Sequence, residues 1–444
     1  MGGKLKFHLR NWETLTKDSE VLNLVKGLKI PLLHTVTPSN SHFALPSNKL
    51  AEEALDKEVF SMLEKKAIQV VRTPDQGRVF SHLFVTPKKD GGFRPIINLR
   101  KVNAVIPYQH FQMEGLKNVQ DILLQGNWLI KIDLSDAFFS VPLHKDSRKL
   151  AAFHWKGVPY EFRVACFGLA CAPRVFTKLM KVPIAFLRKL GLRVVVYLDD
   201  LLVMAASPRL ALEARDTTML VLESLGFTVN TKKSVLIPVQ ELTYLGILIN
   251  SVNLTFSLPE EKVTSLLKSC QKISTLPISV RDLAKFVGKL ISTMPAVTTA
   301  LLQVRHLQRC LSGALHQQGS YEARAYLDKK CSTRGRLVVQ EPPAEKRKAS
   351  LYPPPRLDDS ERCRRERGLG SKLRGLAHRG SVETRREGSP HKRVRDDCSK
   401  SGNQDLRKVE KPQVDSAPGR QHSDPVLHHE TGGHQEQQAA AQGQ

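Results

Sequence analysis

Two aspartates interrupt the most apolar run of the sequence. The run extends from Val194 to Ala205, with Asp199 and Asp200 near its middle. Read on their own, the two residues are the turn of a β-hairpin, although neither flank offers the glycine or asparagine that a tight turn favours. Carboxylates held between buried strands need compensation, and a divalent cation supplies it. The pair is therefore a candidate metal site.

A second apolar segment also ends at an aspartate. Asp133 closes the segment that begins at Leu129. Alone, Asp133 is read as a helix N-cap or a turn residue. Phosphoryl transfer by two metal ions, however, needs carboxylates from separate strands that converge on ions about 3.5–4 Å apart. The two segments together predict such a centre if their strands are neighbours.

Alternating strands and helices must bring these carboxylates together. Apolar spacing, prolines and glycines predict helices over 48–66, 172–190 and 210–225, the last ended by Gly226. The strands expected beside them cover 80–86, 94–99, 227–230 and 242–249. Ser257 with Glu260, and Ser279 with Asp282, fit the capping-box spacing of two later helix starts. The first fifty residues are punctuated by prolines and are expected to form a loosely structured lead-in.

The composition indicates a partner that carries phosphates. The chain has 444 residues, enough for two or three domains, and a formal net charge of +25. Its seven cysteines contain no C-x-x-C pair, which argues against a disulfide framework or a zinc ribbon and for a reducing compartment. No apolar run has the length of a signal peptide core or a membrane span. We therefore expect an intracellular protein, cytoplasmic or nuclear, with no membrane partner.

The sequence changes character after about Lys330. The remainder is rich in Arg, Gly, Pro, Gln and His, and its only aromatic residue is Tyr352. Such a composition offers too little apolar surface to offset chain entropy, so we expect disorder over 329–444. Basic clusters at 346–348, 362–367 and 391–395 could serve nuclear import or RNA binding, or could simply be solvated charge.

Several motifs in order resemble reverse transcriptases. Tyr197-Leu198-Asp199-Asp200 resembles their Y-x-D-D box, and Asp133-x-x-Asp136-Ala137-Phe138 resembles their first catalytic motif. The resemblance extends from about Ile68 to Asn250. It implies an α+β right-hand polymerase, with fingers and a palm with an antiparallel sheet over 51–250, and a helical thumb over 251–328.

The resemblance also implies a role for each motif residue. Asp133, Asp199 and Asp200 match the ligands of two Mg²⁺ ions, for which Mn²⁺ can substitute, and Lys233 matches a lysine that protonates departing pyrophosphate. Phe138 matches an aromatic gate that leaves no room for a 2′-hydroxyl, so dNTPs are selected. Other residues match contacts to the incoming nucleotide: Lys88 or Lys89, Arg94, Asp136, Ala137, Phe167 and Gly168. The matching primer grip is Tyr244, Leu245 and Gly246. Many relatives have Leu-Pro or Met-Pro before the phenylalanine, where this chain has Ala165-Cys166.

Within the family, short segments are most similar to DIRS-type retrotransposons, which integrate with a tyrosine recombinase. These segments are 2–5, 11–13 and 172–178. Gypsy-like and retroviral enzymes are more distant. An RNase H domain usually follows the thumb in such elements, and the sequence after Lys330 lacks its pattern. We hypothesise that this tail is a frame-shifted reading of the RNase H region.

Three further readings stay open. An RNA-dependent RNA polymerase also uses two metals, but it typically has a Gly-Asp-Asp box and no aromatic gate like Phe138. An inactive retroelement remnant would only bind nucleic acid through its charge. The chain could also be the polymerase part of a reverse transcriptase/RNase H polyprotein. For an active enzyme the expected partners are an RNA or DNA template–primer duplex and dNTPs, with RNase H and recombinase from the same element.

Overall fold

A computed structural model describes residues 1–39, 46, 48–73, 77–88, 91–274, 278–297, 300–325 and 344–345. These residues all belong to the first of two compact units, Met1–Val382. The second unit, Glu383–Gln444, lies outside the described residues. The disorder expected over 329–444, and the basic clusters there, also lie outside them, apart from the short strand β15 (Ala344–Glu345).

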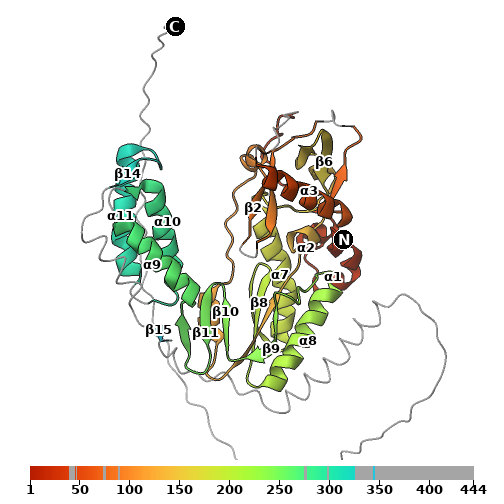
Figure 1. Ribbon diagram of the computed structural model, residues 1–444. Coiled ribbons are helices and arrows are strands. Elements are labelled where there is room, and N and C mark those ends of the chain that lie inside the picture. The colour runs from red at the N-terminus through yellow and green to blue at the C-terminus, as the bar shows by residue number, and fades with distance from the viewer. Residues whose placement is uncertain are drawn as a thin grey trace, which may run out of the picture. The chain divides into compact units, whose positions relative to one another are not determined.

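A four-stranded antiparallel sheet lies at the centre of the fold (Figure 1). Its strand order is β7 (Arg193–Tyr197), β8 (Asp200–Ala205), β4 (Trp128–Asp133) and β9 (Val235–Val239). Helix α7 (Ala172–Lys189) contacts β7, and α8 (Pro208–Ser224) contacts the other three strands.

Both faces of this sheet are buried, which explains why its sequence is apolar without alternation. Ile130, Val194 and Leu201 belong to the hydrophobic cluster that includes α7 and α8. Their neighbours along the strands, such as Leu129 and Leu202, point to the opposite face and join a second cluster. The long apolar run around Asp199 therefore forms two central strands, as the sequence predicts.

The second cluster belongs to the C-terminal part of the described chain. It unites a small sheet, in the order β10 (Glu241–Tyr244), β11 (Ile247–Asn250), β12 (Thr255–Ser257) and β15, with α10 (Val280–Ile291) and its neighbours. Those neighbours are α9 (Glu260–Ser274), α11 (Ala300–Gln318) and the pair β13 (Ile278–Ser279) and β14 (Arg324–Ala325).

The remaining elements include a hairpin, a second sheet and a helix. The hairpin pairs β2 (Leu83–Pro87) with β3 (Phe93–Ile97). The sheet has the order β1 (Ile68–Val70), β6 (Val158–Phe162) and β5 (Ala152–Trp155). Helix α3 (Lys49–Glu64) begins where the Asn48 side chain accepts a hydrogen bond from the amide of Leu50. Short helices complete the chain: α4 (Arg100–Asn103), α5 (Leu116–Ile122), η2 (Phe138–Ser140) and α6 (Lys145–Arg148).

The prediction of a loosely structured N-terminus is wrong. The first residues form η1 (Lys4–His8), α1 (Leu9–Leu15) and α2 (Ser19–Lys26). Leu5 and Trp12 are fully buried, and the indole of Trp12 donates a hydrogen bond to the carbonyl of Leu225, 3.0 Å away. The segment is ordered because it covers the end of α8, a long-range contact that proline spacing does not reveal.

Two other local predictions are wrong. Residues 227–230 form a single antiparallel bridge, between Val229 and Leu134, and not a full strand. The amides of Ser135 and Asn230 donate to the carbonyls of Thr228 and Asp133 around this bridge. On the side of β4 away from β8, the ladder partner is β9, a strand that the sequence pattern did not predict. Ser257 ends β12, and α9 begins three residues later, whereas Ser279 caps α10 by accepting from the amide of Asp282, as predicted.

Four of the seven cysteines lie among the described residues. Cys166, Cys171, Cys270 and Cys310, the four whose state is described, are not in disulfides. Within the described residues, no helix is long and apolar enough to cross a membrane.

Candidate active site

The register of the central sheet brings the three predicted carboxylates together. Asp133 is the last residue of β4 and pairs with Asp200, the first residue of β8. Asp199 lies in the turn before β8, and its carbonyl accepts a hydrogen bond from the amide of Leu134 at 3.0 Å. The strands of the two apolar segments are therefore neighbours, as a two-metal centre requires.

The turn that presents Asp199 is strained. Tyr197 pairs with Asp200, so only Leu198 and Asp199 connect β7 to β8. Leu198 has a φ of +53°, a left-handed conformation that costs a residue other than glycine on the order of 1–3 kcal/mol. Such strain persists where the surrounding structure enforces it, and it clusters at functional sites. The left-handed conformation of Leu198 explains how a tight turn forms here without the usual glycine.

The site concentrates negative charge. Burial, and then the neighbouring Asp200 carboxylate, raises the pKa of Asp133. Burial also raises the pKa of Asp199, with the other two carboxylates adding to the effect and Arg94 opposing it. Lys131 is the partner of Asp200, with Nζ 3.1 Å from Oδ1.

The donor set fits divalent cations. Oxygen ligands of this kind are those that Mg²⁺ prefers. The Oδ1 atom of Asp200 is buried and accepts no hydrogen bond from the described residues, in spite of the nearby ammonium. Among the described residues, however, no three His, Cys, Asp or Glu side chains are gathered tightly enough to hold an ion. The carboxylates fit metal ions chemically, and Asp200 is turned toward Lys131.

A cavity of about 630 Å³ opens above the carboxylates. The predicted site residues on its wall are Asp133, Asp199, Asp200, Lys233, Lys88, Arg94, Asp136, Ala137, Phe138 and Phe167. Lys89 lies outside the described residues. A lining that holds both basic groups and carboxylates suits a ligand that carries phosphates and metal ions together.

Aromatic rings also line this cavity. Phe138 meets Phe167 and Phe176 edge-on, at centroid distances of 5.1 and 5.6 Å. The guanidinium of Arg94 lies 5.0 Å from the centre of the Phe167 ring, a cation–π contact that holds Arg94 toward the cavity. Phe138 is thus fixed by neighbouring rings at the cavity wall.

Gly168 does not line the cavity, but it fixes the loop that carries Phe167. Its φ is +111°, and a Cβ atom there would lie 2.0 Å from the carbonyl oxygen of Ile97 in β3. Asn103 secures the same loop by donating to the carbonyl of Gly168 and accepting from the amide of Ala170. Sequence reasoning missed Asn103, because only the fold brings it to a loop 65 residues away.

The turn after β4 is held from two sides. Asp136 has a φ of +49°, and its carboxylate pairs with Lys65 of the α3 C-terminus at 2.9 Å. Ser234 accepts a hydrogen bond from the amide of Asp133 at 3.0 Å. The backbone of Lys233 bonds to Asn230, a hydrogen-bond partner of the Asp133 side chain. Sequence reasoning assigned no role to Lys65 or Ser234, because only the fold brings them to this turn.

The predicted primer-grip residues lie outside this cavity. Leu245 and Gly246 form the left-handed turn between β10 and β11, with φ values of +48° and +74°. Tyr244 is fully buried, and its hydroxyl donates to the carbonyl of Asp200 at 3.1 Å. Burial raises the pKa of Tyr244, so the hydroxyl stays protonated as a donor. Through this hydrogen bond, Tyr244 supports the hairpin that contains Asp199 and Asp200.

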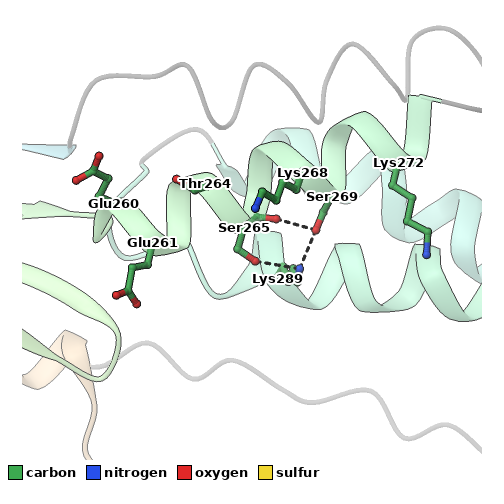
Figure 2. Close-up of a pocket in the computed structure, with 8 residues that line it drawn as sticks. All are labelled: Glu260, Glu261, Thr264, Ser265, Lys268, Ser269, Lys272 and Lys289. Atoms are coloured by element: carbon green, nitrogen blue, oxygen red, sulfur yellow. Dashed lines mark hydrogen bonds between the residues drawn. The ribbon is translucent and has the colours of Figure 1, made fainter. Parts of the chain in front are cut away.

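A second hollow lies on α9 (Figure 2). Its lining includes two carboxylates, Glu260 and Glu261, beside hydroxyls and lysines. Lys289 of α10 donates to the hydroxyls of Ser265 and Ser269 there, and Lys268 and Lys272 lie along the same helix. Lysines and hydroxyls are typical contacts to a nucleic-acid backbone. No predicted site residue belongs to this surface.

Comparison with known proteins finds one family. A family model described as reverse transcriptase (RNA-dependent DNA polymerase) matches residues 86–249. The Gag-Pol polyprotein of Walleye dermal sarcoma virus is 29% identical over 293 residues, which make up 64% of this chain and 16% of that polyprotein. The Pro-Pol polyprotein of Simian foamy virus type 3 is 26% identical over 205 residues, 45% of this chain and 17% of the polyprotein. The chain spans about one sixth of the length of these relatives.

Solved structures confirm the fold. The foamy viral protease-reverse transcriptase dRH in complex with double-stranded DNA has a TM-score of 0.56 and 19% identity, and the match covers 74% of this chain and 58% of that one. The foamy viral protease-reverse transcriptase in complex with an RNA/DNA hybrid has a TM-score of 0.55 and 17% identity, covering 76% and 46%. The predicted α+β right-hand polymerase fold is confirmed.

Proposed function

We propose that this chain, in which residues 86–249 form a reverse transcriptase domain, is an RNA-directed DNA polymerase that extends a primer 3′-hydroxyl with dNTPs. The observation that carries the proposal is the pairing of Asp133 with Asp200 beside the strained turn of Asp199, on the wall of a cavity of about 630 Å³. Basic and aromatic groups of the kind that bind nucleotides share this wall.

In this proposal Asp133, Asp199 and Asp200 hold two Mg²⁺ ions, for which Mn²⁺ substitutes. Such ions activate the primer hydroxyl and stabilise the leaving pyrophosphate. The rest of the work is positioning and charge stabilisation by the chain itself. The raised pKa values of Asp133 and Asp199 support this assignment, because burial and neighbouring carboxylates penalise their negative charge and a bound cation would compensate it.

The incoming dNTP would be held from three sides. Arg94 and either Lys88 or Lys89 bind the triphosphate, and the backbone of Asp136 and Ala137 meets its oxygens. Phe138 lies under the sugar and excludes a 2′-hydroxyl. Lys233 donates a proton to pyrophosphate. The primer end would lie toward the turn of Leu245 and Gly246, and a duplex would run along the lysines of α9.

We further propose that the chain derives from a retrotransposon, most similar to DIRS-type elements, and works inside the cell. The relatives are polyproteins. The chain is accordingly the polymerase part of a longer product, with 51–250 as fingers and palm and 251–328 as thumb. RNase H and recombinase of the same element, and a template–primer of RNA or DNA, are its expected partners.

Nucleotide incorporation tests the proposal. The full chain is given poly(rA)–oligo(dT), Mg²⁺ or Mn²⁺, and either dTTP or UTP, beside an Asp199→Asn, Asp200→Asn control. We expect dTTP to be incorporated by the unaltered chain alone. Preference for UTP would favour an RNA polymerase. Duplex binding without any incorporation would indicate an inactive remnant.

A further inference from the structure

We propose that Lys131 is a built-in counter-cation of the carboxylate cluster, which holds Asp200 in the metal-free protein and competes with divalent ions for that carboxylate. The inference rests on the metal site of the proposed function. It assigns a role to a residue that belongs to no motif of the sequence.

The strand register dictates the contact. Lys131 and Asp133 are two residues apart on β4, so their side chains leave the same face of the sheet. Asp200 pairs with Asp133, and Lys131 pairs with Leu202. Lys131 is therefore on the diagonal from Asp200, a spacing that a long side chain bridges.

The ammonium of Lys131 contacts one of the three carboxylates directly. Nζ lies 3.1 Å from Oδ1 of Asp200, and the two side chains are only 21% and 24% exposed, so solvent screens the pair incompletely. The charge of Lys131 thus offsets carboxylate repulsion in the absence of an ion.

This arrangement has a consequence for metal affinity. A divalent ion bound by Asp200 would bring two positive charges close to the ammonium, so Lys131 must leave Oδ1 before the ion is fully bound. The Oδ1 atom accepts no well-aligned hydrogen bond from the described residues, which leaves it ready to change partners.

Manganese binding to the full chain without nucleic acid tests the inference. Electron paramagnetic resonance measures free Mn²⁺ in titrations of the wild type, Lys131→Met and Lys131→Arg. Lys156→Met is the matched control, because Lys156 pairs with Glu52 and Asp56 and its loss removes the same charge elsewhere. We expect Lys131→Met to bind Mn²⁺ about tenfold more tightly. Lys131→Arg and Lys156→Met should match the wild type.

A second readout is thermal unfolding in EDTA and in Mn²⁺. Lys131→Met should unfold at a lower temperature in EDTA than Lys156→Met. Mn²⁺ should raise the unfolding temperature of Lys131→Met by more than it raises that of Lys156→Met. Lys131→Gln serves the same test if Lys131→Met gives no folded protein. Equal Mn²⁺ affinity in Lys131→Met and Lys156→Met would overturn the inference while the metal site stands. Unchanged Mn²⁺ binding after Asp199→Asn with Asp200→Asn would overturn the metal site, and the inference with it.

Discussion

At the scale of single residues, the carboxylates of Asp133 and Asp199 lie in positions where burial disfavours their negative charge. The folded chain raises the pKa of Asp133 and Asp199 above the usual 3.8. Between the usual and the raised value, the folded state binds more protons than the unfolded one. The two groups therefore make the metal-free protein less stable as the pH rises through that window. Function, not stability, explains their presence.

Neutralising Asp199 should stabilise the metal-free protein. In EDTA at pH 7, we expect Asp199→Asn to raise the unfolding temperature by roughly 2–4 °C, the shift that about 1 kcal/mol produces in a domain of this size. The difference should shrink as the pH falls through the raised pKa and vanish only below 3.8, where Asp199 becomes protonated in the unfolded state as well. Calorimetry across pH measures this, with the exposed Asp216→Asn as control. A lower unfolding temperature for Asp199→Asn at pH 7 would contradict the charge argument.

Phe138 should control sugar selection. Its ring is held between Phe167 and Phe176 at the cavity wall. Phe138→Ala would open space for a 2′-hydroxyl, and we expect the ratio of kcat/KM for UTP to that for dTTP to rise by about 10–200-fold. Primer extension with each nucleotide measures the ratio. An equal loss of kcat/KM for UTP and dTTP would show that Phe138 only supports the core.

At the scale of elements, the sequence predicted those that depend on local pattern. Strands β7 and β8 and helices α3, α7 and α8 follow from apolar runs and from caps such as Asn48. The packing of the N-terminal segment was missed because it depends on Trp12, whose hydrogen-bond partner, Leu225, lies 213 residues away. The roles of Lys131, Lys65 and Asn103 depend on register and loop contacts, which a single sequence does not reveal.

The loop of Phe167 should tolerate no side chain at Gly168. An added Cβ would lie 2.0 Å from the carbonyl of Ile97, and the φ of +111° is unfavourable for alanine. We expect Gly168→Ala to reduce the free energy of unfolding by at least about 3 kcal/mol, measured by urea denaturation. Gly313→Ala in α11 is the control, because nothing lies within 4 Å of its Cβ position. A loss of less than about 1 kcal/mol for Gly168→Ala would refute the packing argument.

The α9 surface should contact a nucleic-acid backbone. Replacing Lys268, which lines the hollow of Figure 2, with Gln should weaken binding of a primer–template, and the salt dependence should become shallower by about one ion. Fluorescence anisotropy at several salt concentrations measures both. Lys57→Gln in α3 is a charge-matched control outside both hollows. An equal effect in the two variants would mean that only net charge matters.

At the scale of the whole molecule, charge and fold agree with each other. The net charge of +25 favours a polyanion, and the fold is that of proteins solved with duplexes. Composition alone predicted the partner class, whereas the order of motifs predicted the fold. The precise arrangement of the carboxylates could not be foreseen, because it depends on which residue of β4 faces Asp200.

The most direct test of polymerisation by the carboxylate triad is single-turnover addition of one dNTP to a bound primer–template, comparing the wild type with Asp133→Asn. We predict that the rate of addition falls by at least about 10³-fold, while the Kd of the primer–template stays unchanged. A variant that binds the duplex equally and adds the nucleotide at the wild-type rate would contradict the account.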